Sequence, residues 1–267
     1  MIVDYHMHLR NKHEEIAHDT ESVEQFVEVA CAQGIDEIGF TEHIYYFTQT
    51  RALWTVPYQV ERCRYDLDTY VDAILQARDR GLPVKLGLEV DYVPGREDET
   101  RGILDPYPWD FLLGSVHFID GLGIDGAPRL VDHVGVDETW RLYFETLAIA
   151  ARSGLFDSLS HPDLAKVHGN RVDGFDYTEI ADAIADSGVA VEVSTAGLRK
   201  PVGELYPHPD FLAVCRERNV PITTGSDAHV PNLVGRDFDR ARELLRSAGY
   251  ETVTVFERRQ ARQEPIG

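Results

Sequence analysis

Seven short apolar runs recur along this chain, and six of them end at a histidine, glutamate or aspartate. The first run, Ile2-Val3, leads into His6 and His8, whose imidazoles would point to one face of an extended strand because strand side chains alternate. Segments with apolar residues at helical spacing separate the runs, as over residues 137–153. Strands that alternate with helices predict a parallel sheet with right-handed crossovers. The predicted strands are residues 2–3, 37–41, 84–88, 111–116, 156–160, 189–193 and 220–224.

Polar residues at the ends of so many strands favour a closed barrel over an open sheet. In a parallel barrel the C-terminal ends of all strands meet at one mouth, where barrel enzymes keep their catalytic residues. An open doubly wound sheet would bring together only the ends beside its switch point. We therefore expect one α/β barrel domain over residues 1–267, with a polar, frayed tail over about 257–267. A capping box at Ser22 and Gln25 is expected to open the first helix, which Gly34 would end.

Composition and charge narrow the possible partners. The formal net charge is −20, from 46 acidic and 26 basic residues, which disfavours a nucleic-acid backbone as the main partner. No apolar run approaches the roughly 18 residues of a membrane span, so we expect a cytoplasmic protein without membrane contact. The three cysteines are widely spaced, which makes a disulfide framework improbable. The excess of acidic residues fits a site that holds several divalent cations, or a cationic substrate, although most acids could simply keep the protein soluble; the oligomeric state stays open.

Nine candidate metal ligands lie at the strand ends or in the first loop. Each could instead be an ordinary core or surface residue, but that interpretation weakens when all of them follow the same pattern. Nine nitrogen and oxygen ligands exceed what one ion uses, and imidazole mixed with carboxylate suits zinc, iron or manganese. Two to three such ions are expected, with Glu89 as a natural bridging carboxylate. The candidates are His6, His8, His18, His43, Glu89, His117, His161, Asp227 and His229.

Six short motifs that span nearly the whole chain resemble those of one known family, the polymerase and histidinol phosphatase (PHP) family of metal-dependent phosphoesterases. The motifs are His6-Met7-His8, Thr41-Glu42-His43, Gly87 to Tyr92, Gly114 to Phe118, Ser160 to Asp163 and Gly225 to His229. The resemblance implies a distorted (β/α)7 TIM-like barrel, the PHP fold, with a trinuclear site at the C-terminal ends of the strands.

The same resemblance implies which residues would hold each ion. The first ion would take His6, His8, Glu89 and Asp227. The second would take Glu89, His117 and His161, with Glu89 shared. The third would take His43 and His229 together with a histidine of the first loop. Both His13 and His18 could supply that last ligand, and His18 is favoured because it lies closer to the helix start.

Within the family, the histidinol-phosphate phosphatase branch is the nearest likeness. Three stretches carry it: Gly87–Gly95, Gly114–Asp120 and Ala196–Pro207. This likeness implies hydrolysis of L-histidinol phosphate to L-histidinol and phosphate, a step of histidine biosynthesis, by attack of a metal-bridging hydroxide. The expected catalytic residues are Glu89, Asp227, His229 and Arg199.

Contacts to the substrate are predicted from side-chain chemistry at the mouth. Arg199 offers a planar pair of donors to a phosphate, and Lys166 could share this role; the alternative is that Arg199 is a surface arginine. Glu42 and Glu204 could meet the ammonium group of the substrate. Tyr206, with other aromatic residues of the loops, could flank the imidazole ring, or these rings could simply fill the loops.

Three rival functions are open on sequence alone. A phosphoesterase of the same family could act on mononucleotides or other small phosphate esters. A metal-binding barrel without catalysis is disfavoured by the complete ligand set. A metal-dependent amide hydrolase of similar barrel type usually carries a bridging lysine at a strand end, and no predicted strand here ends in lysine.

Overall fold

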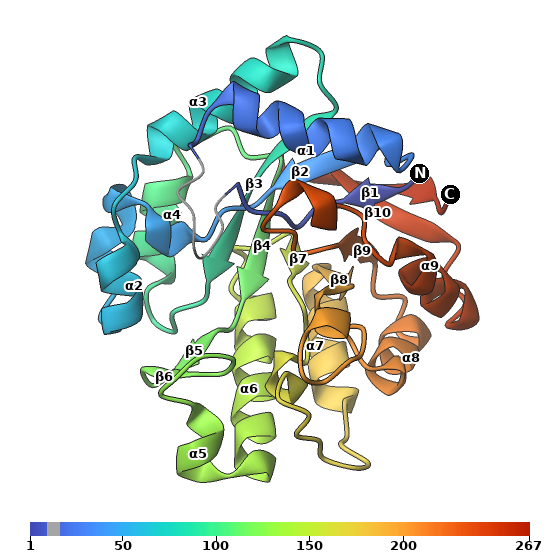
Figure 1. The fold of residues 1–267 in the computed structure, drawn as a ribbon. Coiled ribbons are helices and arrows are strands. Elements are labelled where there is room, and N and C mark those ends of the chain that lie inside the picture. The colour runs from blue at the N-terminus through green and yellow to red at the C-terminus, as the bar shows by residue number, and fades with distance from the viewer. Residues whose placement is uncertain (10–16) are drawn as a thin grey trace.

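A barrel of seven parallel strands forms the centre of the computed structural model, which describes residues 1–9 and 17–267 (Figure 1). The strands follow one another in chain order around the barrel, and hydrogen bonds join its two edges. Tyr5 N donates to Thr224 O at 2.9 Å and His8 N donates to Ala228 O at 2.8 Å. The predicted distorted (β/α)7 barrel is confirmed. Its strands are β1 (Val3–Asp4), β2 (Glu37–Phe40), β3 (Val84–Asp91), β4 (Phe111–Ser115), β7 (Ser158–Leu159), β8 (Ala190–Ser194) and β9 (Ile222–Gly225).

Helices surround the barrel, and the longer ones, such as α1, α3 and α6, each bury an apolar stripe (Figure 1). In α6 the residues predicted at helical spacing, among them Trp140, Tyr143 and Leu147, are all buried. The α-helices are α1 (Thr20–Ala32), α2 (Pro57–Arg62), α3 (Leu67–Asp79), α4 (Glu97–Leu104), α5 (Leu130–Val134), α6 (Val136–Arg152), α7 (Thr178–Ser187), α8 (Pro209–Glu217) and α9 (Phe238–Ser247). The 3₁₀ helices are η1 (Ile44–Tyr46), η2 (Thr48–Leu53), η3 (Leu164–Lys166), η4 (Ala196–Arg199) and η5 (Pro231–Leu233).

The start of α1 differs from the predicted capping box. Asp19 is the N-cap, and its side chain accepts a hydrogen bond from Ser22 N at 2.8 Å. Ser22 therefore lies in the first turn, and the prediction that it opens the helix is wrong. Both residue types cap well, and the earlier one prevails because the helix already begins at Thr20.

Aromatic side chains close the end of the barrel that lies opposite the strand C-termini. The Phe111 ring fills the interior there, with the Tyr5 and Phe256 rings at centroid distances of 4.9 and 5.6 Å. A Cβ atom added to Gly39 or Gly87 would lie 2.5 or 2.6 Å from the Phe111 ring. Glycine at these two strand positions thus makes the room that the ring occupies, so this end of the barrel is filled by side chains.

The C-terminal tail is ordered, so the prediction of a frayed tail is wrong. Strand β11 (Gln260–Pro265) pairs antiparallel with β10 (Thr252–Glu257), as a hairpin outside the barrel. The chain ends beside its start, where Gly267 N donates to Met1 O at 3.1 Å (Figure 1). Pairing satisfies the backbone of a polar segment whose composition alone suggested disorder. Phe256, a buried residue of β10, stacks on the Phe111 ring, so the hairpin packs against the closed end of the barrel.

The mouth of the barrel is walled by the segments that follow β2 and β4. After β2 the chain forms η1, η2 and α2 over a region that looked irregular in the sequence. After β4 a small hairpin, β5 (Phe118–Ile119) and β6 (Leu122–Gly123), leads to α5. No helix of the described residues combines the length and the apolar character that crossing a membrane requires.

Candidate metal centre

Eight of the nine predicted ligands converge at the mouth of the barrel. They form four overlapping groups, and within each group the ligand atoms lie within 4.8 Å of one another. This arrangement follows from the fold, because every contributing strand runs in the same direction and ends at the same level. The groups are His6, His8 and Asp227; His6, Glu89 and His161; His43, Glu89 and His117; and His8, His43 and His229.

Glu89, near the end of β3, lies at the centre of the cluster and is fully buried. Its Oε1 is 2.9 Å from His161 Nε2 and 3.6 Å from His117 Nε2. Its Oε2 is 2.7 Å from His43 Nδ1 and 3.7 Å from His8 Nε2. The two oxygens therefore face different histidines, which is the arrangement that a carboxylate shared by neighbouring ions requires.

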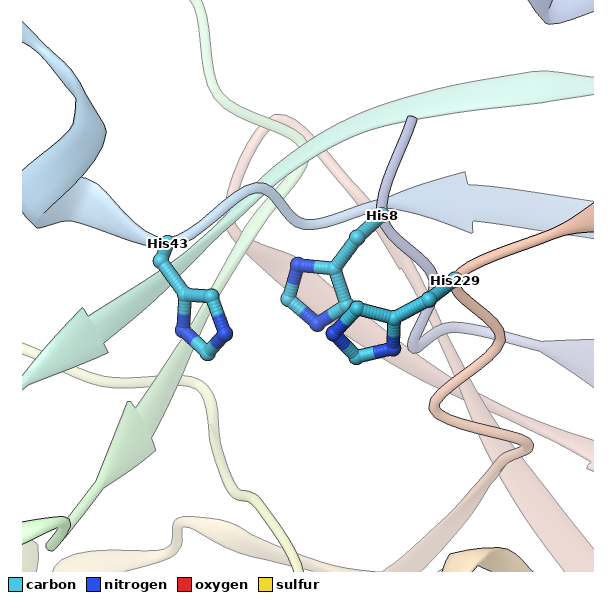
Figure 2. Close-up of side chains that lie close together, drawn as sticks. All are labelled: His8, His43 and His229. Carbon is cyan, nitrogen blue, oxygen red and sulfur yellow. The ribbon is translucent and has the colours of Figure 1, made fainter. Parts of the chain in front are cut away.

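His43 and His229, which were predicted to share an ion with a first-loop histidine, form a group with His8 instead (Figure 2). The ring centroids of His8 and His43 are 4.4 Å apart, and those of His8 and His229 are 4.3 Å apart. His8 follows β1, His43 follows β2 and His229 follows β9, so a single site collects ligands from both ends of the chain. Figure 2 shows the three rings converging on one region.

His18 is placed beside this cluster and belongs to none of the four groups. Its Nε2 lies 3.4 Å from Glu42 Oε1, and its ring packs against Phe47, Tyr65 and Tyr70. The rival candidate, His13, lies outside the described residues. The choice of the first-loop ligand therefore stays a prediction, and the geometry of His18 places it behind Glu42.

Carboxylates that the sequence reasoning missed lie behind the histidines. Asp91 Oδ1 is 2.6 Å from His117 Nδ1, and Glu192 Oε1 is 2.8 Å from His6 Nδ1. A carboxylate on one ring nitrogen leaves the other nitrogen free to ligate a metal. Asp91 lies two residues after Glu89, and that spacing on a strand could have indicated it. Glu192 lies inside a strand and no motif pointed to it.

The electrostatics of the site fit bound cations. His6 Nε2 is buried and has no hydrogen-bond partner among the described residues. Burial lowers the pKa of His117, but the carboxylates of Asp91 and Glu89 raise it to about 10. Burial raises the pKa of Asp227, but His229, His6 and His8 lower it well below its ordinary value. Buried carboxylates that need a positive counter-charge, with an orphaned imidazole nitrogen beside them, form a donor set suited to divalent transition metals.

A cavity of about 150 Å³ opens above the cluster. Asp227 and His229 line it together with several other ligands. Its walls add one acid and one base that are not ligands, Asp125 after β6 and Lys200 after η4. The apolar part of the wall consists of Tyr45, Tyr58, Phe118, Leu164 and Tyr206.

Arg199 and Lys166 do not line this cavity. The Arg199 guanidinium donates to Ser226 O and, at 3.4 Å, to Thr195 O, and so ties the end of β8 to the end of β9. Lys166 is 1% exposed and donates to Leu205 O at 2.8 Å, with Asp163 Oδ2 at 3.0 Å. Lys200, the residue after Arg199, lines the cavity instead. The phosphate contact had been predicted for Arg199 from the sequence.

The two predicted ammonium contacts are also engaged elsewhere. Glu42 is fully buried behind His8, with Oε2 at 3.7 Å from His8 Nδ1. Glu204 forms ion pairs with Arg171 and, at 3.6 Å, with Lys166. Tyr206, in contrast, lines the cavity, and its ring lies 6.3 Å from that of His161.

Comparison with known proteins identifies relatives along the whole chain. The PHP domain model matches residues 4–196 and the PHP-associated model matches residues 212–238. A Deinococcus radiodurans protein named "Probable histidinol-phosphatase" is 34% identical, over 91% of this chain and 93% of that protein. The Bacillus subtilis histidinol-phosphatase is 27% identical over 82% of this chain and 91% of its own length.

A solved structure shares the fold. The histidinol phosphate phosphatase of Lactococcus lactis, solved with zinc, L-histidinol and phosphate, superposes with a TM-score of 0.76. It is 23% identical, and the match covers 98% of each chain. Together, the domain match and the relative that is more than 30% identical establish that this chain belongs to the PHP domain family.

Proposed function

We propose that this protein is a metal-dependent phosphatase that hydrolyses L-histidinol phosphate to L-histidinol and phosphate. The observation that carries the proposal is the cavity above the ligand cluster. Its floor is made of metal-type ligands, and its wall combines Asp125, Lys200 and aromatic rings. The names of the Deinococcus radiodurans and Bacillus subtilis relatives support the same substrate.

The four ligand groups would hold two to three zinc, iron or manganese ions. When bound, such ions withdraw charge from phosphoryl oxygens and generate a nucleophile from water near neutral pH. Glu89 would be shared between neighbouring ions, because its two oxygens face different histidines. Asp227 and His229, which line the cavity, would face the phosphoryl group directly.

The wall of the cavity would hold the organic part of the substrate. Histidinol phosphate carries an ammonium and an imidazole besides its phosphate, so one end is negative and the other is positive. Asp125 offers a carboxylate to the positive end, and the rings of Tyr58 and Phe118, tilted at a centroid distance of 5.8 Å, offer aromatic contacts. Lys200 offers a charge to the phosphate, and Arg199 would do so only after releasing its carbonyl partners.

In the reaction, the oxygen of water forms a bond to phosphorus while the bond from phosphorus to the ester oxygen breaks. The attacking water gives up a proton, and the leaving alkoxide takes one up, so that the products are the alcohol and phosphate. The part of this chain is to hold the phosphate above the ligand cluster and the organic group against the wall, so that the attack is in line. We also propose a cytoplasmic location, since a substrate with a phosphate and an ammonium does not cross membranes and is consumed where it is made.

A phosphate-release screen with metal-reconstituted protein tests the proposal. The substrates are histidinol phosphate, mononucleotides and sugar phosphates, at equal concentration. The proposal predicts that kcat/KM is highest for histidinol phosphate by at least about tenfold. A preference for mononucleotides would instead support the other small-ester activity of the family. The absence of phosphate release from all three classes would refute phosphatase function.

A further inference from the structure

Glu192 is a carboxylate in the middle of β8, and only 1% of its surface is exposed. A buried carboxylate is costly unless hydrogen bonds and charges compensate it. No motif of the sequence and no group of candidate ligands includes Glu192. Its partners therefore indicate what it does.

Both oxygens of Glu192 are used, and each contacts a different candidate ligand. Oε1 lies 2.8 Å from His6 Nδ1, and Oε2 accepts a hydrogen bond from the backbone N–H of His161 at 2.5 Å. With Nδ1 bound in this way, His6 turns Nε2 toward Glu89 and Asp227, at 3.6 and 3.7 Å. One carboxylate thus sets the direction of one ligand and the backbone position of another.

The backbone of His161 needs such an anchor. Its φ is +25°, which is unusual for a residue with a side chain. A backbone held in a sparsely populated region persists only when its surroundings fix it. The hydrogen bond to Glu192 Oε2 holds the backbone N–H of His161 in place. The ring of His161 then lies with Nε2 2.9 Å from Glu89 Oε1.

Gly225, at the end of β9, provides the space for this contact. A Cβ atom at this position would lie 1.9 Å from Glu192 Oε1 and 2.6 Å from His6 Cβ. The strand neighbour of Glu192 is Thr223, which is also buried. The sequence thus combines a buried acid with the one residue type that leaves room for it to reach His6.

We propose that Glu192 is a positioning residue of the metal centre, which orients His6 and His161 together. It would thereby support two of the four ligand groups: the group that both histidines form with Glu89, and the group that His6 forms with His8 and Asp227. The inference rests on the proposed metal centre. It differs from the role of Asp91, which contacts the ring of one candidate ligand, His117. Removing Glu192 should therefore weaken two ion sites, whereas removing Asp91 should weaken one.

The test measures metal affinity site by site. Apo-protein is titrated with Mn²⁺ or Zn²⁺ against a competing chelator, for wild type, Glu192→Gln and Asp91→Asn. An amide cannot replace the carboxylate, because one of its two ends donates and would face an N–H group. Glu192→Gln is expected to bind about 10- to 100-fold more weakly at two sites, as for losses behind metal-bound histidines. Asp91→Asn is expected to lose affinity at one site only.

Thr223→Val is the matched control, since it changes the buried position beside Glu192 on β9, and the Thr223 hydroxyl has no hydrogen-bond partner among the described residues. It should keep wild-type affinities. Unchanged affinities in folded Glu192→Gln would overturn the inference, and so would a loss confined to one site. If the wild-type protein itself binds fewer than two ions, the proposed metal centre is refuted, and the role of Glu192 is refuted with it.

A second measurement uses the unaltered protein, in case Glu192→Gln does not fold. Long-range ¹⁵N–¹H spectra of the zinc-loaded protein report the tautomer of each imidazole. The inference requires the proton of His6 on Nδ1, facing Glu192, and none on Nε2. A proton on Nε2 of His6 would contradict it.

Discussion

Glu89→Gln is the substitution that the ligand cluster predicts to be most damaging. Glu89 is fully buried, and each of its oxygens lies within 3 Å of a different imidazole nitrogen: 2.9 Å for His161 and 2.7 Å for His43. Glutamine keeps the size of the side chain but replaces one oxygen with an NH₂ group, which cannot ligate a cation. One side of the shared carboxylate is therefore lost whichever way the amide turns.

The magnitude follows from the position of this carboxylate in the cluster. Changes behind a ligand cost about 10- to 100-fold in affinity or activity, so loss of a bridging ligand should cost at least about 100-fold. That factor corresponds to about 2.8 kcal/mol, at 1.4 kcal/mol for each tenfold change. We expect this loss in metal affinity and in kcat/KM for histidinol phosphate.

The assay pairs a chelator-competition titration with steady-state kinetics at saturating metal. Glu24→Gln serves as the control, because it makes the same chemical change on the exposed face of α1. It should leave both quantities within about twofold of wild type. Glu89→Gln with near-normal metal content and turnover would remove Glu89 from the site and refute the reasoning.

The cavity wall and the C-terminal hairpin give three further tests. In the first test, kcat/KM of Arg199→Ala and Lys200→Ala is measured on histidinol phosphate and on an aryl phosphate. Loss of a phosphate-binding cation should lower kcat/KM by the same factor for both substrates, about 2–4 kcal/mol in transition-state free energy. A loss confined to one substrate would argue against that role. In the second test, Asp125→Asn should raise KM for histidinol phosphate about two- to fivefold, since an exposed charge pair contributes about 0.2–1 kcal/mol. KM for the aryl phosphate should stay unchanged. Equal increases in KM for both substrates would exclude a contact between Asp125 and the ammonium. Deleting residues 258–267 should lower Tm by more than about 4 °C, because β10 loses its only strand partner among the described residues, and an unchanged Tm would show that the hairpin is dispensable.

The barrel and its ligand cluster could be predicted because the same local signal repeats. Each apolar run ends where a buried strand ends, and a histidine or acid there must lie at the mouth of a parallel barrel. His43 and His117 are examples: each is a single histidine that follows a predicted strand, and this position places both in the cluster. The repetition of the pattern made the prediction possible.

The parts that escaped prediction depend on contacts between distant segments. Glu192 alternates with apolar residues inside a strand, and only its neighbours in space, His6 and His161, show its purpose. The C-terminal hairpin turns at Arg258 and Arg259, both with positive φ. Such turns are usually recognised by Asn-Gly or Asp-Gly, so two arginines gave no signal.

The kinds of side chain in the cavity wall, namely an acid, a base and aromatic rings, were predicted, but few of the individual residues were. Tyr206 lines the cavity as expected. Two of the predicted residues, Glu204 and Lys166, are instead paired with each other. Sequence position could not tell these two from Asp125 and Lys200, because all four lie in segments that follow strands and whose paths are set by tertiary packing.

Elemental analysis of gently purified protein tests the central claim most directly. The protein is isolated without chelators, and zinc, iron and manganese are measured per chain by mass spectrometry, before and after reconstitution with each metal. The convergence of eight candidate ligands predicts two to three ions per chain and phosphatase activity that rises with metal content. Fewer than one ion per chain, with no activation on adding any of the three metals, would contradict the account.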